Sequence, residues 1–358
     1  MARSIEKLQL DERRKAILME IISDYVATAE PVGSRAIAKK HFENLSPATI
    51  RNVMSDLEDL GYLRQPHASA GRIPTDKGYR YFVDHILPGP RTADEPGIIG
   101  DYYDRELKNQ PLEEVLESAC NLLSKTSNQT GLVMVPSFSH MLFKHIEFVK
   151  VGKNEALAVF ISEMGVLQNK IIPVEEDFSQ EKLTSISNYL NREFKDKSVN
   201  WIRAEILRRV KFEKEHYDQL IKRALDLWTR TFDDHDRDKD ADLLVNGIIN
   251  FFDQPEFSAD LEAIKVLFKA VEEKTKLIKL LDLCLEHDGM TIIIGEESEE
   301  EEMQGCSLIA QNYRVGDEKA GTMAIFGPKR MDYQKMIAIV NNTAKTVSKL
   351  LSERKKRS

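Results

Sequence analysis

Polar side chains suited to contacting nucleic-acid bases recur on one side of the segment 45–60. A helix, at about 100° per residue, gathers Ala48, Arg51, Asn52 and Ser55 on that side, with Thr49 on its flank. Arginine and asparagine side chains can each form two hydrogen bonds with the edge of a base in the major groove. The spacing therefore indicates a helix face that contacts DNA.

A segment rich in cations and interrupted by glycine follows. Tyr62-Leu63-Arg64 and Arg72-Ile73-Pro74 are candidate short strands, and the small residues 68–71, Ser69 among them, form the tip between them. Five side chains that can carry positive charge stand against the single acid Asp76 in this part of the chain, namely Arg64, His67, Arg72, Lys77 and Arg80. Such a ribbon can lie along a phosphate backbone. A capped amphipathic helix with no partner would explain 45–60 alone, but it would not explain the ribbon.

Strong local signals bound the helix that carries these side chains. Ser46 can accept hydrogen bonds from free amide groups at the helix start, and Pro47 has no amide hydrogen that needs a partner there. Gly61 is suited to the position just after the helix. The opposite side of this helix is apolar and is expected to pack against a core; it comprises Ile50, Val53, Met54, Leu57 and Leu60. The acids of this helix fall in its second half, so its first half is the part that can approach phosphates.

Two helices are expected before this one, and one after the ribbon. Residues 11–28 have helical apolar spacing with Asp11 as N-cap, and 35–42 form a shorter helix with Ser34 as possible N-cap. Thr75 or Asp76 begins the fourth helix. This pattern predicts a winged helix-turn-helix domain over residues 1–90. The candidate DNA-binding residues are Arg35, Lys39, Lys40, Ser46, Ala48, Thr49, Arg51, Asn52, Ser55, Arg64, His67, Ser69, Arg72, Lys77 and Arg80.

The charge of the chain is unevenly placed. The net charge is −8, whereas the first 90 residues hold 13 Lys+Arg and 12 Asp+Glu. The remainder is therefore strongly acidic. DNA binding requires the positive charge of the first domain to be concentrated on one face.

The rest of the chain predicts an α/β domain that is interrupted by an insertion. A Pro/Gly-rich linker over 91–105 is followed by a helix and strand-like runs that suggest an antiparallel meander over 106–175. Residues 176–285 have mostly helical, charged patterns, and 286–358 return to strands and end in a helix. Strands on both sides of a helical block indicate one domain with a helical insertion, in an α+β multidomain protein.

The sequence lacks the common catalytic and metal-binding motifs. There is no phosphate-binding P-loop, dinucleotide fingerprint, zinc-protease motif or nucleophile elbow, so we expect neither an enzyme nor a cofactor or metal. The three cysteines are far apart, and no stretch has the character of a signal peptide or membrane span, which favours a cytoplasmic protein. The alternating acids at 234–240 resemble a calcium loop but lack its glycine and closing glutamate. The acidic run 296–302 is expected to be a solvated loop.

Three stretches resemble the bacterial family of heat-inducible transcription repressors called HrcA. They are PVGSRAIA at 31–38, SPATIRNVMSDLEDLGYLRQPHASAGRIPTDKGYRYFVD at 46–84 and GPKRMDYQKMIAIV at 327–340. The resemblance implies a winged-helix domain followed by a GAF-like domain, into which a dimerisation domain is inserted. It also implies repression of chaperone operons through an inverted-repeat operator, the CIRCE element, with relief by heat and help from the chaperonin GroEL.

Dimerisation is compatible with the expected mode of DNA binding, because one recognition helix contacts only a few base pairs and two-fold operators match two-fold proteins. Candidate dimer residues lie on the apolar helices between 180 and 285: Trp201, Leu207, Leu225 and Trp228. These residues could instead form that domain's own core. An alternative to chaperone control is a winged-helix repressor whose GAF-like domain binds a small molecule.

Overall fold

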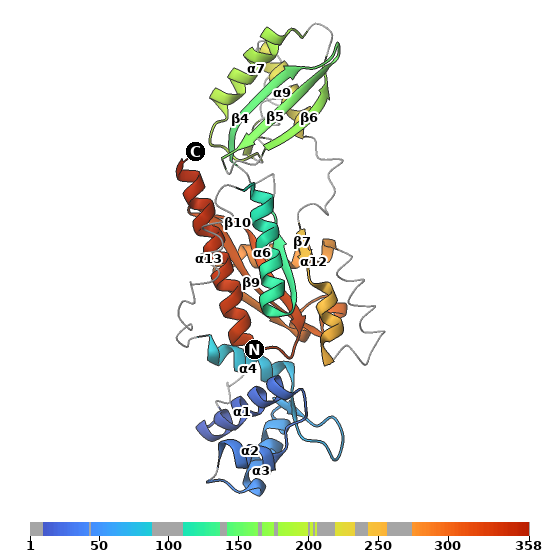
Figure 1. Cartoon of the computed structure of the whole chain (residues 1–358), viewed down its shortest axis with the longest axis vertical. Coiled ribbons are helices and arrows are strands. Elements are labelled where there is room, and N and C mark those ends of the chain that lie inside the picture. Colours follow the sequence, from blue (N-terminus) through green and yellow to red (C-terminus); the bar gives the residue numbers. More distant parts are fainter. Residues whose placement is uncertain are drawn as a thin grey trace, which may run out of the picture.

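The computed structural model describes residues 10–42, 44–87, 110–136, 142–163, 167–174, 178–199, 201–202, 205, 219–232, 243–255 and 274–357. Three parts follow one another along its long axis (Figure 1). A helical N-terminal domain lies at one end, a large sheet with helices on both faces lies in the middle, and a smaller sheet with two helices lies at the other end.

The N-terminal domain confirms the expected helices and ribbon. Its elements are α1 (Glu12–Thr28), α2 (Ser34–His41), α3 (Pro47–Asp59), β1 (Leu63–Arg64), β2 (Ile73–Pro74) and α4 (Asp76–Ile86). Asp11 caps α1 by accepting from the Arg14 amide at 2.8 Å, and Thr75 caps α4 by accepting from the Gly78 amide at 3.2 Å. The expected role of Ser34 as N-cap is wrong. Ser34 is the first residue of α2, and Gly33 occupies the cap position without a side-chain bond.

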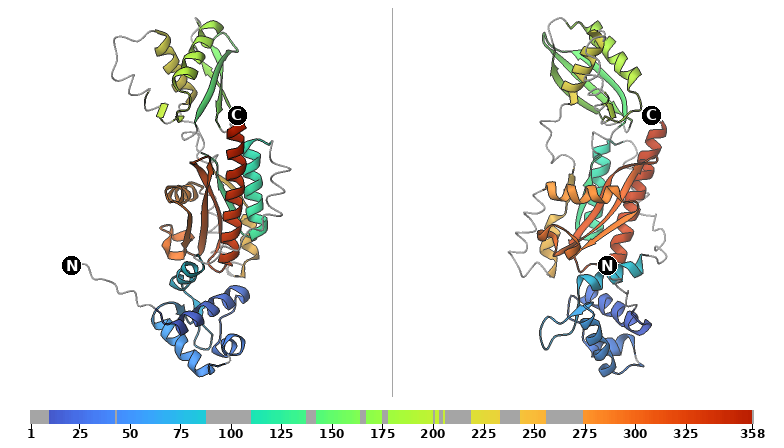
Figure 2. Two further views of the ribbon diagram at one scale, coloured as in Figure 1. Left: turned by 90° about the vertical axis from the view of Figure 1, so that its left-hand side faces the viewer. Right: turned by 180° about the vertical axis from the view of Figure 1, so that it is seen from behind.

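The central sheet is built from strands that are far apart in the sequence. They are β3 (Thr130–Met134), β7 (Leu243–Asn246), β8 (Met290–Ile294), β9 (Cys306–Val315) and β10 (Glu318–Pro328). Their order is β7-β3-β10-β9-β8, and every neighbouring pair is antiparallel. α6 (Leu112–Ser127) and α13 (Tyr333–Arg357) cover one face, and α12 (Lys274–Glu286) covers the other (Figures 1 and 2).

Two apolar clusters lie on the two faces of this sheet. The cluster beneath α6 and α13 continues into the N-terminal domain, where it includes Tyr79 and Val83 of α4. The rings of Tyr79 and Tyr333 lie 5.9 Å apart at this junction. The opposite cluster joins α12 and the 3₁₀ helix η4 (Ile248–Asp253) to the sheet. Because burial is continuous across the junction, the N-terminal domain packs onto the central one rather than hanging from a linker.

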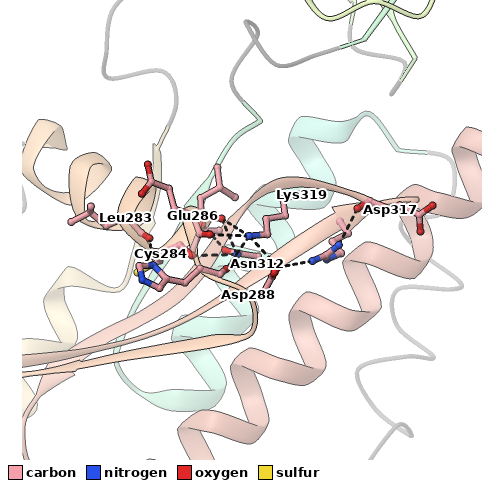
Figure 3. A network of polar contacts seen from close by, with 11 residues as sticks. Leu283, Cys284, Glu286, Asp288, Asn312, Asp317 and Lys319 are labelled. Carbon is pink, nitrogen blue, oxygen red and sulfur yellow. Dashed lines mark hydrogen bonds and ion pairs between the residues drawn. The ribbon is translucent and has the colours of Figure 1, made fainter.

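The end of α12 is capped by side chains from the sheet (Figure 3). Lys319 Nζ donates to the carbonyls of Leu285 at 2.9 Å and His287 at 3.0 Å, and Asn312 Nδ2 donates to the His287 carbonyl at 2.9 Å. The last carbonyls of a helix have no partner within the helix, and a cation there also complements the helix dipole. These contacts therefore fix α12 against β9 and β10.

The second, smaller sheet differs from the arrangement that the sequence suggests. β4 (Phe143–Lys150), β5 (Glu155–Ser162) and β6 (Leu167–Pro173) form the expected meander, but they pair only with one another among the described strands. α7 (Gln180–Glu193) and α9 (Gln219–Phe232) share a separate core with them. The insertion thus begins before β4, within the expected first part of the central domain. Conversely, β7 and nearly all of α12 fall inside 176–285, yet β7 is a strand of the central sheet and α12 packs on that sheet.

Several sequence predictions fall outside the described residues. These are the linker over 91–105, the acidic loop over 234–240 and other parts of the helical block 176–285. In the part that is described, no helix is long and apolar enough to cross a membrane. Within the same part, no group of three or more His, Cys, Asp or Glu side chains is placed to hold a metal ion.

Candidate nucleic-acid interface

The outer face of α3 carries the side chains that the sequence places there. Ala48, Arg51, Asn52 and Ser55 are exposed, whereas Ile50, Val53, Met54 and Leu57 of the same helix are buried. Ser46 Oγ accepts a hydrogen bond from the Thr49 amide at 3.1 Å and lies 2.9 Å from Thr49 Oγ1. The Ser46 and Thr49 hydroxyls therefore hold the start of the helix, and the next two turns present the free polar groups.

The ribbon after α3, which we call the wing (residues 62–74), forms beside this face. β1 and β2 pair antiparallel, with Arg64 opposite Ile73. His67 and Ser69 are exposed at the tip, where Gln65 Nε2 donates to the carbonyls of Ala68 at 3.0 Å and Ala70 at 2.9 Å. One side chain thus holds both sides of the tip.

The base of the wing is tied to the segment between α1 and α2. Val32 and Arg72 exchange two backbone hydrogen bonds of 2.9 Å each. Gly71 is required for this approach, because a Cβ atom there would lie 2.4 Å from the Val32 carbonyl oxygen. α3 and the wing are therefore anchored to the same helical core.

Four of the predicted cations are free to contact phosphates. Arg35 and Lys39 on α2, Arg51 on α3 and Arg64 on β1 are exposed, and none of them forms an ion pair with the described residues. They come from three neighbouring elements. Their charges are not offset by a carboxylate within the described part of the chain.

Three other predicted cations are committed to contacts within the domain. Lys40 pairs with the buried Asp24. Lys77 Nζ donates to the Leu60 carbonyl at 2.7 Å and lies 4.5 Å from the centre of the Tyr62 ring. The Asp24 carboxylate offsets the charge of Lys40, whereas the Leu60 carbonyl and the Tyr62 ring hold the Lys77 ammonium against the domain.

Arg72 is the third of these committed cations. It bonds Glu58 of α3 at 2.9 Å, and its side chain is only 17% exposed. Its guanidinium is thus partly neutralised and largely covered. The positive surface is therefore smaller than the sequence alone suggests.

Arg80, which the sequence places among the candidate DNA contacts, is engaged by residues of the central domain in this structure. Its Nε donates to Glu297 Oε1 at 2.7 Å, and its guanidinium also donates to the Ile292 carbonyl at 2.6 Å. The hydrogen bonds to the Glu297 carboxylate raise the pKa of Arg80. Arg80 therefore joins the N-terminal and central domains.

The acidic run 296–302 is likewise not only a solvated loop. Besides the Glu297 contact, the Glu296 amide donates to Asp76 Oδ2 at 3.0 Å, and Lys329 Nζ donates to Asp76 Oδ1 at 2.6 Å. Gly295 has a positive φ of 54°, and a Cβ atom there would lie 2.0 Å from Asp76 Oδ2. This segment docks onto the start of α4 and completes the interdomain contact.

Sequence reasoning missed the residues that position this interface. Glu58 and Gln65 brace the wing, and Asp76, Glu297 and Lys329 join the domains. The spacing of Glu58 on α3, just before the wing, is a usable local signal. Partners such as Arg80 and Glu297, which are 217 residues apart, leave no local signal.

Of the four candidate dimer residues, the structure describes the side chains of two, Trp201 and Trp228, and these differ in exposure. Trp228 is 2% exposed and packs against Phe143, with ring centroids 5.3 Å apart, so it belongs to the domain's own core. Trp201 is 45% exposed. Leu207 and the side chain of Leu225 lie outside the described residues.

Comparisons with known proteins cover nearly the whole chain. The family model described as HrcA protein C terminal domain matches residues 113–337, and that described as Winged helix-turn-helix transcription repressor, HrcA DNA-binding, matches residues 9–85. The heat-inducible transcription repressor HrcA of Geobacter sulfurreducens is 44% identical over 349 residues, which cover 96% of this chain and 98% of that protein. The repressor of the same name from Syntrophobacter fumaroxidans is 37% identical over 346 residues, with the same coverage.

One solved structure supports the overall fold. A crystal structure of a hypothetical protein matches with a TM-score of 0.63 and 23% sequence identity, covering 97% of this chain and 100% of that one. At 23% identity the match supports the fold and carries no conclusion about function.

Proposed function

This chain belongs to the HrcA family of heat-inducible transcription repressors, and from that premise we propose that it represses transcription by placing α3 in the major groove of operator DNA. The observation that carries the proposal is the outer face of α3, where Arg51, Asn52 and Ser55 are exposed beside an ordered wing. Helices of this motif contact base edges with residues near their N-terminal ends.

The proposal assigns separate tasks to the exposed polar groups. Arg51 and Asn52 contact base edges, because both can form paired hydrogen bonds in the major groove. Arg35, Lys39 and Arg64 contact phosphates and set the position of the domain on the duplex. His67 and Ser69 place the wing tip on the backbone next to the groove.

We further propose that two copies bind an inverted repeat, the CIRCE element that the family resemblance implies. A single recognition helix contacts only a few base pairs, and two-fold operators match two-fold proteins. The open face of the small sheet is our candidate contact, since Val149, Leu157 and Ile171 form one row across β4, β5 and β6. Val149 is 37% and Ile171 60% exposed, so a second copy would bury apolar surface here.

The central domain is, in this proposal, the GAF-like domain into which the dimerisation domain is inserted. Its antiparallel five-stranded sheet with helices on both faces supports that assignment. The family resemblance also supports action in the cytoplasm, release of chaperone operons on heating, and maintenance of the active repressor by the chaperonin GroEL.

Selection of bound sequences from random duplex DNA, followed by fluorescence anisotropy, tests the proposal. We expect an inverted repeat to be enriched and bound at least about 10³-fold more tightly than scrambled DNA at physiological salt. Affinity should fall on heating and recover faster with GroEL and ATP than without them. Equal binding to all sequences would contradict the proposal, while specific binding that ignores GroEL would remove only the chaperonin part.

A further inference from the structure

Resting on that proposed function, we infer that Glu58 is a positioning residue that sets the wing at a fixed angle to the recognition helix. Glu58 lies on α3, on the same helix as the side chains proposed to contact bases. Its carboxylate is the one described group of α3 that bonds both limbs of the wing.

The two oxygens of Glu58 serve different limbs. Oε1 accepts a hydrogen bond from the Gln65 amide at 3.1 Å, just after β1. Oε2 pairs with the Arg72 guanidinium at 2.9 Å, just before β2. A single carboxylate thus restrains both strands at the ends that lead into the tip, and a charge-assisted bond is stronger than one between neutral groups.

The brace extends from Glu58 to the wing tip. Gln65, held at its backbone by Glu58, donates through its side chain to Ala68 and Ala70. Arg72, held at its side chain by Glu58, bonds Val32 through its backbone. A displacement of Glu58 would therefore loosen the tip and the base of the wing together.

Arg72 depends on this contact. Its Nε is buried and has no hydrogen-bond partner among the described residues. Without Glu58 the guanidinium would lose the carboxylate that compensates its partial burial. It would then have to move toward solvent and draw β2 with it.

The sign of the charge makes the inference testable. Carboxylates near DNA repel phosphates, so neutralising one ordinarily strengthens binding to every sequence. Neutralising Glu58 should do the opposite for operator DNA, because the misplaced wing no longer fits the site that α3 selects. The neighbouring Asp59 is an ideal comparison, since it is exposed and forms no ion pair within the described part of the chain.

The first experiment measures binding of the full chain by fluorescence anisotropy, with operator and scrambled duplexes, for wild type, Glu58→Gln and Asp59→Asn. Both variants remove one negative charge. We expect Asp59→Asn to bind both duplexes at least as tightly as wild type, and Glu58→Gln to lose about tenfold for the operator, the scale of one charge-assisted hydrogen bond, and less for the scrambled duplex. Equal operator affinity in the two variants would overturn the inference.

The second experiment needs no DNA. A nitroxide attached at Ser69→Cys reports wing motion by electron paramagnetic resonance, and the three native thiols are buried. Burial raises the pKa of the Cys120 thiol to about 12 and that of Cys284 to about 11, so both react slowly with the label. We expect a sharper spectrum in Glu58→Gln and in Arg72→Gln, which breaks the same pair from its other end, but not in Asp59→Asn.

DNA binding and label mobility distinguish a failure of the proposed function from a failure of the role assigned to Glu58. A wild-type chain that shows no sequence preference would defeat the proposed function, and the spectra would still decide whether Glu58 orders the wing. An immobile label in both Glu58→Gln and Arg72→Gln would overturn the brace, even if the wild-type chain binds the operator specifically. A purely structural loss would instead lower the thermal midpoint and weaken binding to both duplexes equally.

Discussion

Arg80 of α4 and Glu297 beside β8 form a two-pronged ion pair that joins the DNA-binding and central domains. The pair is reinforced by the Ile292 carbonyl, and Asp76 with Lys329 forms a second bridge at the start of the same helix. The helix that directly follows the wing is thus fixed to the edge of the central sheet. A displacement of that edge would therefore move α4, and with it the wing, through these side-chain contacts and not only through the linker.

The first prediction concerns this ion pair. In a double-mutant cycle of Arg80→Ala and Glu297→Gln, we expect a coupling of about 1 kcal/mol in the free energy of unfolding, because both side chains are partly exposed. Urea unfolding measures it. Asp84→Asn is the control, since Asp84 lies 3.6 Å from Arg80 on the same helix but does not reach the central domain. Coupling no larger than that of the Arg80–Asp84 pair would contradict an interdomain role.

The second prediction concerns the recognition helix. Asn52→Ala and Arg51→Ala should each weaken operator binding by about 1–3 kcal/mol, because each removes a side chain suited to paired hydrogen bonds with a base. Anisotropy with operator and scrambled duplexes measures the loss. Arg192→Ala is the matched control, as Arg192 is also exposed but lies on α7, far from the DNA-binding domain along the chain. Unchanged operator affinity in both α3 variants would defeat the assignment of α3 as recognition helix.

The third prediction separates Arg64 from Arg72, which the sequence alone treats alike. Arg64→Ala should weaken binding to all sequences and flatten the dependence of log affinity on log salt by about one unit, as expected for one lost phosphate contact. Arg72→Ala should change that slope less, because Glu58 already neutralises the Arg72 charge. Affinities over a salt series provide the measurement. Equal changes of slope would mean that Arg72 contacts phosphate in the complex.

Local chemistry predicts much of the N-terminal domain and little of its surroundings. Ser46, Pro47 and Gly61 bound α3 as expected, because capping and the left-handed conformation depend on neighbouring residues only. The strands over 143–173 were recognisable from their apolar pattern, but the sheet to which a strand belongs depends on pairing with distant segments. The partner of Arg80 was hidden for the same reason.

The fourth prediction uses the two tryptophans of the chain. Trp228→Ala should destabilise the inserted domain by about 3–5 kcal/mol, because it leaves a large cavity in a closed core. Trp201→Ala should cost far less, since Trp201 is 45% exposed and lies outside that core, with Lys197 Nζ 5.2 Å from its ring centre. In each single-tryptophan variant, emission should be blue-shifted for Trp228 and red-shifted for Trp201. Reversed emission would contradict the packing described for α9.

The fifth prediction concerns the open face of the small sheet. Ile171→Asp should convert a dimer into a monomer in sedimentation velocity at micromolar concentration, because a charge placed within an apolar contact lacks a partner when it is buried. Leu283→Asp is the matched control. Leu283 is also an exposed apolar residue, at 52%, but it lies on α12 of the central domain.

Loss of the dimer should also reach the DNA-binding surface. An Ile171→Asp monomer should bind the inverted repeat far more weakly than wild type, yet bind a single half-site as well as the wild-type chain does, because its α3 is unaltered. That difference distinguishes lost association from misfolding, which would weaken both. A stable dimer in Ile171→Asp, together with a monomer in Leu283→Asp, would move the subunit contact from the inserted domain to α12.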